Sequence, residues 1–351
     1  VAASEPKLRN LRVVALGGGT GLPVVLRGFK ELGLIENPEE RERLVGVVTV
    51  TDDGGSSGRL RDEFGMIPPG DVRNCLVALS HNEPLMSRLF QARYRSGGAL
   101  DGHTAGNLIL AALAQESDGS FLAAVSLAGE VLNIHGTVLP SSLASACLHA
   151  RLADGTTVSG ESNIARSGQA VEQVWLDPSD LEAAPGVIDA IGAADVVVLG
   201  PGSLFTSVVP NLLLPEIGRA LAETEALRVL LVNAMTEQGE TNAFGAVEHL
   251  AAVNRHLGFE GVDAALLAAD RIPDRTLDRY RSEGANPVGA AEEIDRMVPV
   301  ALRRDLLEWT PKVRHEPRKT AAAVLEAYER WIAGGRQRPA GRVVARERSG
   351  S

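Results

Sequence analysis

The 351-residue sequence has few aromatic residues and fewer basic than acidic residues, and each shortage excludes a class of partner. Aromatic residues make up 4% of the chain, too few to form a stacking surface for single-stranded nucleic acid. The 45 acidic and 35 basic residues give a net charge of −10, which argues against nucleic acid or an anionic membrane as the main partner. A local basic pocket for a phosphate group is still compatible with this charge.

Cysteine and long apolar runs are also scarce. Cys75 and Cys147 are the only cysteines, and two lone thiols indicate a reducing compartment, neither a disulfide scaffold nor a zinc site. The first ten residues contain no apolar signal core, and no later apolar run is long enough to span a bilayer without interruption. We therefore expect a cytoplasmic protein with no membrane insertion.

The rest of the composition is that of an ordinary globular protein, with 44% apolar and 23% charged residues. A chain of this length can bury one large core or two moderate ones. We expect a polar, mobile lead-in at residues 1–10 and a mobile tail rich in Gly, Arg and Ser at residues 334–351.

The first ordered stretch predicts a strand, a glycine turn and a helix. Residues 11–16 (LRVVAL) form the strand and residues 17–21 (GGGTG) the turn, and the apolar positions that follow recur at helical spacing. Unpaired N–H groups at such a helix N-terminus favour an anion such as phosphate. Leu22 replaces the third glycine of the dinucleotide fingerprint, and no P-loop lysine is present. The motif thus indicates nucleotide or phosphate binding, with a merely tight turn as the alternative.

A longer polar motif follows a second strand. Residues 47–51 (VVTVT) are β-branched, and residues 52–58 (DDGGSSG) contain no apolar side chain. Glycine allows backbone N–H groups to approach a ligand closely, so we interpret this stretch as a polar loop over a phosphate-bearing ligand. A solvated surface loop is the alternative. If the protein is an enzyme, Asp52 and Asp53 would hold Mg²⁺, which prefers oxygen ligands.

Two helices, at residues 72–79 and 84–94, precede a further polar cluster at residues 101–107 (DGHTAGN). His103 and Asn107 are four residues apart and share one helical face if the helix begins early enough. The alternative is that this cluster only caps the helix. In an enzyme, Asp71 or His103 would be the general base.

In residues 131–176 the pattern of apolar and polar residues changes and predicts a β-rich insertion. An Asp154-Gly155 pair between alternating apolar and polar residues predicts a hairpin. We interpret Asp154 and Glu161 as turn and edge residues, not catalytic ones.

Regular α/β order returns with predicted strands at residues 191–199, 228–232 and 264–268, each followed by polar residues. The carboxyl ends of parallel strands share one edge of a sheet, so loops distant in sequence would converge there. The residues alone therefore predict an α/β fold with a mainly parallel sheet and one shared ligand site.

Several long motifs, in order, carry a resemblance to a known family: VVALGGGTGL, VTVTDDGGSSGRLRDEFGMIPPGDVRN, GHTAGNLILAAL, DGTTVSGES, ADVVVLGPGSLFTSVVPNLL and NAMTEQGET. These resemble the YvcK-like proteins, or gluconeogenesis factors, within the CofD-like group that includes 2-phospho-L-lactate transferase. The resemblance covers residue 11 to about residue 332. It implies one Rossmann-like three-layer domain over residues 11–333, a link to gluconeogenic growth, cell shape and cell-wall synthesis, and binding of a UDP-sugar such as UDP-N-acetylglucosamine.

The central loop resembles the YvcK form, and the Trp-containing deazaflavin segment expected of the transferase branch is absent. By resemblance, Tyr280 and Arg314 are nucleotide-sugar contacts. Pro317 stands where that branch can carry a phosphorylatable Thr, so control at that position is not expected. An NAD(P)-dependent dehydrogenase is disfavoured by Leu22 and by the lack of a clear ribose-binding acid after the second strand.

These arguments give a nucleotide-sugar-binding regulatory protein, with a Mg²⁺-dependent transferase as the alternative. No nucleic-acid partner is expected, the ligand is a nucleotide sugar or another nucleotide, and the chain is expected to form a homo-oligomer. The candidate ligand-binding residues are Gly17, Gly18, Gly19, Thr20, Gly21, Asp53, Gly54, Ser56, Ser57, Asn74, His103, Asn107, Gly200, Gly202, Ser203, Asn233, Thr236, Tyr280 and Arg314.

Overall fold

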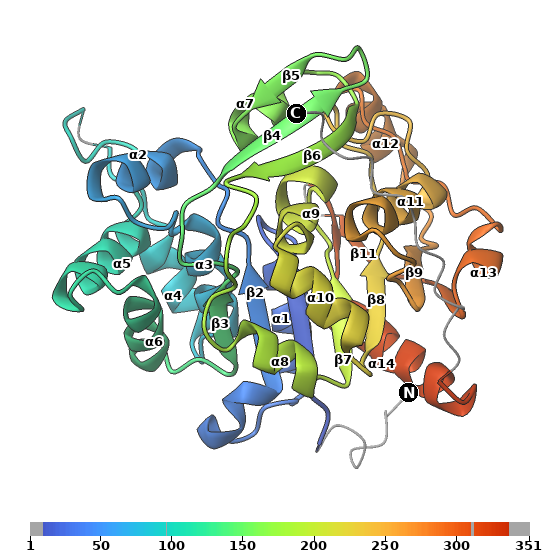
Figure 1. Ribbon diagram of the computed structural model, residues 1–351, viewed down its shortest axis with the longest axis horizontal. Helices are drawn as coiled ribbons and strands as arrows, with labels where there is room; N and C mark the ends of the chain where they lie inside the picture. The colour runs from blue at the N-terminus through green and yellow to red at the C-terminus, as the bar shows by residue number, and fades with distance from the viewer. Residues whose placement is uncertain (1–9, 96, 310–311, 337–351) are drawn as a thin grey trace.

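A computed structural model describes residues 10–95, 97–309 and 312–336 (Figure 1). Of the mobile segments expected at residues 1–10 and 334–351, residues 1–9 and 337–351 lie outside the described residues. In the described ranges, no helix combines the length and apolar character needed to cross a membrane.

The centre of the molecule is a seven-stranded sheet in which every neighbouring pair is parallel. In spatial order its strands are β10 (Val300–Arg304), β9 (Ala264–Ala268), β8 (Leu227–Leu231), β7 (Val196–Leu199), β1 (Val13–Gly17), β2 (Leu44–Val48) and β3 (Thr137–Pro140). The order reverses at β1, which pairs with β2 on one side and β7 on the other. This order confirms the Rossmann-like α/β prediction, and in such sheets ligands bind where the strand order reverses, here between the ends of β1 and β7.

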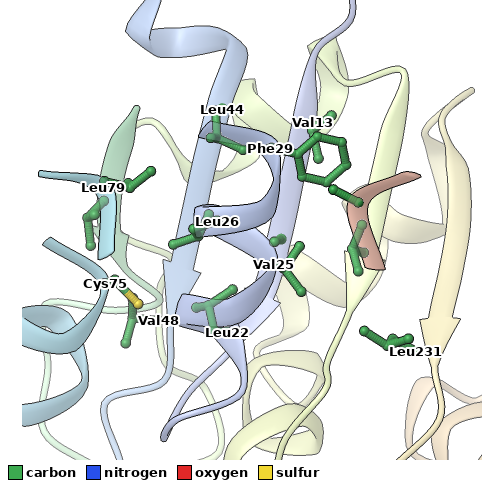
Figure 2. Close-up of a cluster of buried hydrophobic side chains, with 14 of the residues drawn as sticks. Val13, Leu22, Val25, Leu26, Phe29, Leu44, Val48, Cys75, Leu79 and Leu231 are labelled. Carbon is green, nitrogen blue, oxygen red and sulfur yellow. The ribbon is translucent and has the colours of Figure 1, made fainter. Parts of the chain in front are cut away.

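Helices cover both faces of the sheet because its strands are apolar on both faces. On one face α1 (Leu22–Glu31), α3 (Gly70–Leu79) and α14 (Pro317–Ala333) pack over the core shown in Figure 2. A Cβ added at Gly28 of α1 would lie 2.1 Å from the Pro317 carbonyl oxygen, so glycine is what lets α1 and α14 approach each other.

On the opposite face lie α8 (Val187–Ala193), α9 (Val209–Leu212), α10 (Pro215–Glu223) and α11 (Ala246–Leu257). Elsewhere lie α2 (Gly55–Phe64), α4 (Glu83–Phe90), α5 (Ala105–Glu116), α6 (Phe121–Val131), α12 (Asp274–Ser282), α13 (Ile294–Met297), η2 (Pro38–Arg43), η3 (Leu204–Val208) and the antiparallel pair β11 (Leu307–Trp309) and β12 (Val313–His315).

The β-rich insertion is a three-stranded antiparallel sheet of β5 (Thr157–Ser159), β4 (Cys147–Leu152) and β6 (Val171–Asp177), with α7 (Glu161–Arg166) between β5 and β6. The expected start at residue 131 is too early, because β3 pairs with β2 and belongs to the main sheet. The hairpin at Asp154 is confirmed, and its carboxylate accepts the Thr156 N–H at 2.9 Å. The insertion lies over the carboxyl ends of the main strands (Figure 1).

Two boundaries differ from the sequence prediction. Strand β2 ends at Val48, and the predicted polar loop becomes the first turn of α2 from Gly55 onward. The apolar run at 191–199 divides into the end of α8 and strand β7, because alanine and glycine there fit a helix as well as a strand.

Candidate functional site

The glycine turns after β1 and β7 lie against each other at the point where the strand order reverses. A Cβ added at Gly21 would lie 2.1 Å from the Pro201 carbonyl oxygen. One added at Gly18 would lie 2.6 Å from Thr49 Cγ2, and Gly19 has a φ of +58°. These approaches are open only to glycine, so the two turns can pack closely at this point of the sheet edge.

Two asparagines join these turns to the rest of the sheet edge. Asn233, just after β8, accepts the Gly202 N–H at 3.2 Å and donates to the Gly202 carbonyl at 2.8 Å. Asn211 of α9 is fully buried and donates to the Gly17 carbonyl at 3.2 Å. The structure therefore brings together the predicted residues of three strand ends: Gly17–Gly21, Gly200–Ser203 and Asn233.

Asp71, in the first turn of α3, reaches into the first glycine turn. Its Oδ2 accepts the Gly19 N–H at 2.6 Å. Burial raises the pKa of Asp71 to about 6, the Gly19 hydrogen bond opposes that rise, and the nearby Asp52 adds to it. Asp71 therefore carries a carboxyl group that titrates near neutral pH beside a backbone donor.

Arg73 connects the helices around the site, and sequence reasoning did not select it. Its Nη1 donates to Thr104 Oγ1 at 2.6 Å and to Asn107 Oδ1 at 2.5 Å, and its Nη2 donates to Asn74 Oδ1 at 2.9 Å. Asn74 Nδ2 in turn lies 3.5 Å from the Gly19 carbonyl oxygen. An arginine within the apolar pattern of α3 was the one signal in the sequence that could have indicated this role.

The predicted polar cluster at 101–107 contacts the start of α2. Asn107 Nδ2 donates to Ser56 Oγ at 3.0 Å, and Ser56 Oγ lies 3.0 Å from His103 Nδ1. Thr104 is the N-cap of α5, so the capping alternative is confirmed for this residue, and ligand contact by the cluster stays a prediction. On the other side of α2, a Cβ added at Gly70 would lie 2.4 Å from Ser57 Oγ, so Ser57 packs against the start of α3.

The two aspartates after β2 bind backbone N–H groups of the surrounding loops. Asp52 Oδ1 accepts the Gly54 N–H at 2.9 Å, and Asp53 Oδ1 accepts the Ser162 N–H of α7 at 2.9 Å. Within the described ranges, no group of three or more His, Cys, Asp or Glu side chains is placed to hold a metal ion. Asp52 and Asp53 therefore suit Mg²⁺ only if a ligand's phosphate oxygens and water complete its shell.

Glu161 belongs to this carboxylate group, which the sequence did not indicate. We expected a turn or edge residue, but Glu161 opens α7 and faces the site. Burial raises its pKa to about 9, and the charges of Asp52, Asp71, Asp53 and Glu240 add to the rise. Glu161 is therefore protonated at neutral pH.

Ser203 is held by acidic residues of the loop after β8. Its hydroxyl donates to Glu240, which also accepts from the Phe205 N–H at 3.3 Å. Glu240 is 4% exposed. Burial and the Glu240 charge raise the pKa of the neighbouring Glu237 to about 7. Neither glutamate was selected from the sequence, because their burial depends on the insertion and on η3.

Three predicted residues are placed differently. Thr236 is buried and binds the backbone of Asn286, donating its N–H at 2.7 Å and accepting at 2.9 Å, so its side chain fixes a loop. Tyr280 accepts the Val313 N–H at 2.8 Å, and Arg314 is exposed on β12. Among the described residues, neither Tyr280 nor Arg314 forms a hydrogen bond or ion pair with the glycine turns.

A pocket of about 240 Å³ opens beside Asp53, between α2 and β4. Its lining includes the guanidinium-bearing Arg61 and two hydroxyl residues. The pocket residues are Thr51, Asp53, Arg61, Ser145, Ala146, Cys147, Leu148 and Gly160.

Comparison with known proteins gives consistent matches over most of the chain. The model of the family described as 2-phospho-L-lactate transferase CofD matches residues 13–307. The gluconeogenesis factor of Bacillus subtilis is 43% identical over 317 residues, covering 90% of this chain and 97% of that protein. The gluconeogenesis factor of Halalkalibacterium halodurans is 43% identical over 325 residues, covering 92% of this chain and 98% of that protein. A crystal structure of a Bacillus halodurans protein matches with a TM-score of 0.85 at 42% identity, covering 90% of this chain and 100% of that one.

Proposed function

The chain belongs to the CofD family and is a homologue of the gluconeogenesis factors, and from this we propose that it is a regulatory protein that binds a nucleotide sugar such as UDP-N-acetylglucosamine. In this role it couples growth on gluconeogenic carbon sources to cell-wall synthesis and cell shape. The bound nucleotide sugar reports the supply of cell-wall precursor.

One observation supports this proposal above the others: the glycine turns after β1 and β7 meet where the strand order reverses. That is where α/β proteins of this topology bind nucleotides. The diphosphate would lie against the glycine turn at the N-terminus of α1, where the helix dipole favours negative charge. The pocket beside Asp53, with Arg61 in its lining, offers room for a polar group attached to the diphosphate.

Calorimetric titration tests the proposal directly. The protein is titrated with UDP-N-acetylglucosamine, UDP and GDP, with and without Mg²⁺. We expect the uridine diphosphosugar to bind in the micromolar range and to raise the melting temperature, because a ligand stabilises the state that binds it. Absence of binding by every uridine diphosphosugar would refute the proposal.

A matched pair of variants locates the binding site. Gly21→Ala places a methyl group 2.1 Å from the Pro201 carbonyl oxygen. The methyl group of Gly192→Ala in α8 would meet no neighbouring atom within 4 Å. We expect Gly21→Ala to abolish binding and Gly192→Ala to leave it unchanged. If Gly21→Ala binds as the wild type does, the ligand is not held by the glycine turns.

A transferase is the second candidate, and the carboxyl groups near the crevice favour it. Asp71 titrates near neutral pH and could accept a proton as a general base. Asp52 and Asp53 would help to hold Mg²⁺, which would supply neutralisation of the charge on the leaving group. Prolonged incubation with labelled UDP-sugars, candidate acceptors and divalent metals that yields no product would count against this reading.

A further inference from the structure

Arg73 is a buried guanidinium whose hydrogen bonds go to neutral oxygens. It is 7% exposed, and among the described residues it forms no ion pair. A guanidinium can only donate hydrogen bonds, whereas an amide accepts through its oxygen and donates through its nitrogen. Asn74 and Asn107 each turn their oxygen toward Arg73, so each must turn its NH₂ group the other way.

Arg73 thereby sets which group donates in each hydrogen bond from Asn107 through Ser56 to His103. Asn107 Nδ2 donates to Ser56 Oγ, and Ser56 is 5% exposed. Within the described ranges, the one other hydrogen bond of this hydroxyl is to His103 Nδ1. A buried hydroxyl proton without an acceptor is costly, so the Ser56 proton goes to Nδ1. A ring that accepts at Nδ1 is neutral and carries its proton on Nε2.

We propose that Arg73 is a positioning residue that holds His103 in the Nε2–H tautomer, so that His103 offers the ligand a hydrogen-bond donor and not a base. Among the described residues, His103 Nε2 forms no hydrogen bond, and the side chain is 4% exposed. Burial, and then the nearby Arg59 charge, lower the pKa of His103, which keeps the ring neutral near pH 7. The recipient would be a phosphate or sugar oxygen, and this part of the inference rests on the function proposed above.

Asn107→Asp should reverse the direction of the hydrogen bonds between Asn107, Ser56 and His103 with almost no change in side-chain shape. The aspartate side chain has no N–H group, so it must accept from both Arg73 and Ser56. The Ser56 hydroxyl then donates to the carboxylate, and its oxygen accepts from His103 Nδ1–H. The change also suits the first turn of α5, where a negative charge is favourable. If Asn107 and Ser56 only packed against His103, the substitution would leave the tautomer unchanged.

The tautomer is read from the two imidazole ¹⁵N resonances of His103 in ligand-free protein, assigned by difference with His103→Gln. We expect Nε2–H in the wild type and Nδ1–H in Asn107→Asp. The matched control is Asn82→Asp, which makes the same change at an exposed helix cap whose oxygen accepts the Leu85 N–H, and it should keep Nε2–H. A wild-type Nδ1–H ring, or an unchanged Nε2–H ring in Asn107→Asp, overturns the inference.

If Asn107→Asp does not fold, Ser56→Ala tests the same control of the His103 tautomer. Without the hydroxyl, Nδ1 loses its donor and the ring should lose its single tautomer, whereas a pure Nε2–H ring would overturn the inference. Titration of the same samples with UDP-N-acetylglucosamine separates the two proposals. We expect Asn107→Asp to bind about tenfold more weakly, the effect of one lost hydrogen bond to a charged group. A wild type with the expected tautomer but no affinity for nucleotide sugars refutes the proposed function alone.

Discussion

Replacing Asp71 by Asn should stabilise the protein at neutral pH while weakening the site. Asp71 is half-buried, and desolvation raises the pKa of its carboxyl group from 3.8 to about 6. A raised pKa of a carboxyl group means that the folded state binds a proton more readily than the unfolded state. The folded protein therefore loses stability through this group as the pH rises from about 4 to about 6, and the loss is complete above pH 6.

The magnitude follows from the size of the shift. Each unit of pKa corresponds to about 1.4 kcal/mol, so the shift of Asp71 corresponds to a cost on the order of 3 kcal/mol above pH 6. An asparagine keeps an oxygen that can accept the Gly19 N–H and removes the buried charge. We therefore expect Asp71→Asn to raise the free energy of unfolding by about 3 kcal/mol at pH 8, and by close to zero at pH 4.

Urea denaturation at pH 4, 6 and 8 measures the difference. The control is Asp180→Asn, the same change at an exposed position, which should show no such pH-dependent gain. If Asp71→Asn is less stable than the wild type at pH 8, or if its gain is the same at every pH, the reasoning about burial is wrong. Weaker nucleotide-sugar binding by the stabilised variant would show that the destabilising Asp71 carboxylate serves function.

Three further predictions concern the core. Arg228→Met leaves the fully buried Asp263 carboxylate, which Arg228 now binds at 2.8 Å, without its cation and should cost about 3–5 kcal/mol in urea denaturation. Burial lowers the pKa of His315 to about 4, so the wild type should lose stability as the pH falls from 6.5 to 4, and His315→Gln should lack that slope in the same assay. Gly28→Ala forces α1 away from Pro317 and should lower the free energy of unfolding by about 1–3 kcal/mol, visible as a lower melting temperature, whereas Gly192→Ala should not. Unchanged stability in any of these variants would contradict the packing described for it.

Most of the fold could be predicted because its signals are local. The strand, glycine turn and helix at residues 11–31, the strand at 264–268 and the hairpin at Asp154 all depend on neighbouring residues in the chain. The parallel order of the strands then implied a common edge. The prediction of a polar loop after β2 was wrong in part, because α2 begins at Gly55. The sequence GSSG has no helical periodicity, and contacts with α3 and α5 hold α2 in place.

The sequence by itself determined that this protein is α/β and that its glycine turns gather at one sheet edge, because chain order and turn chemistry are local properties. Only the tertiary structure decided the charge state of the site. Glu161, Glu240 and Arg73 owe their properties to burial and to neighbours far away in sequence. Desolvation and Coulomb interactions depend on distances in space, and no spacing along the chain encodes those distances.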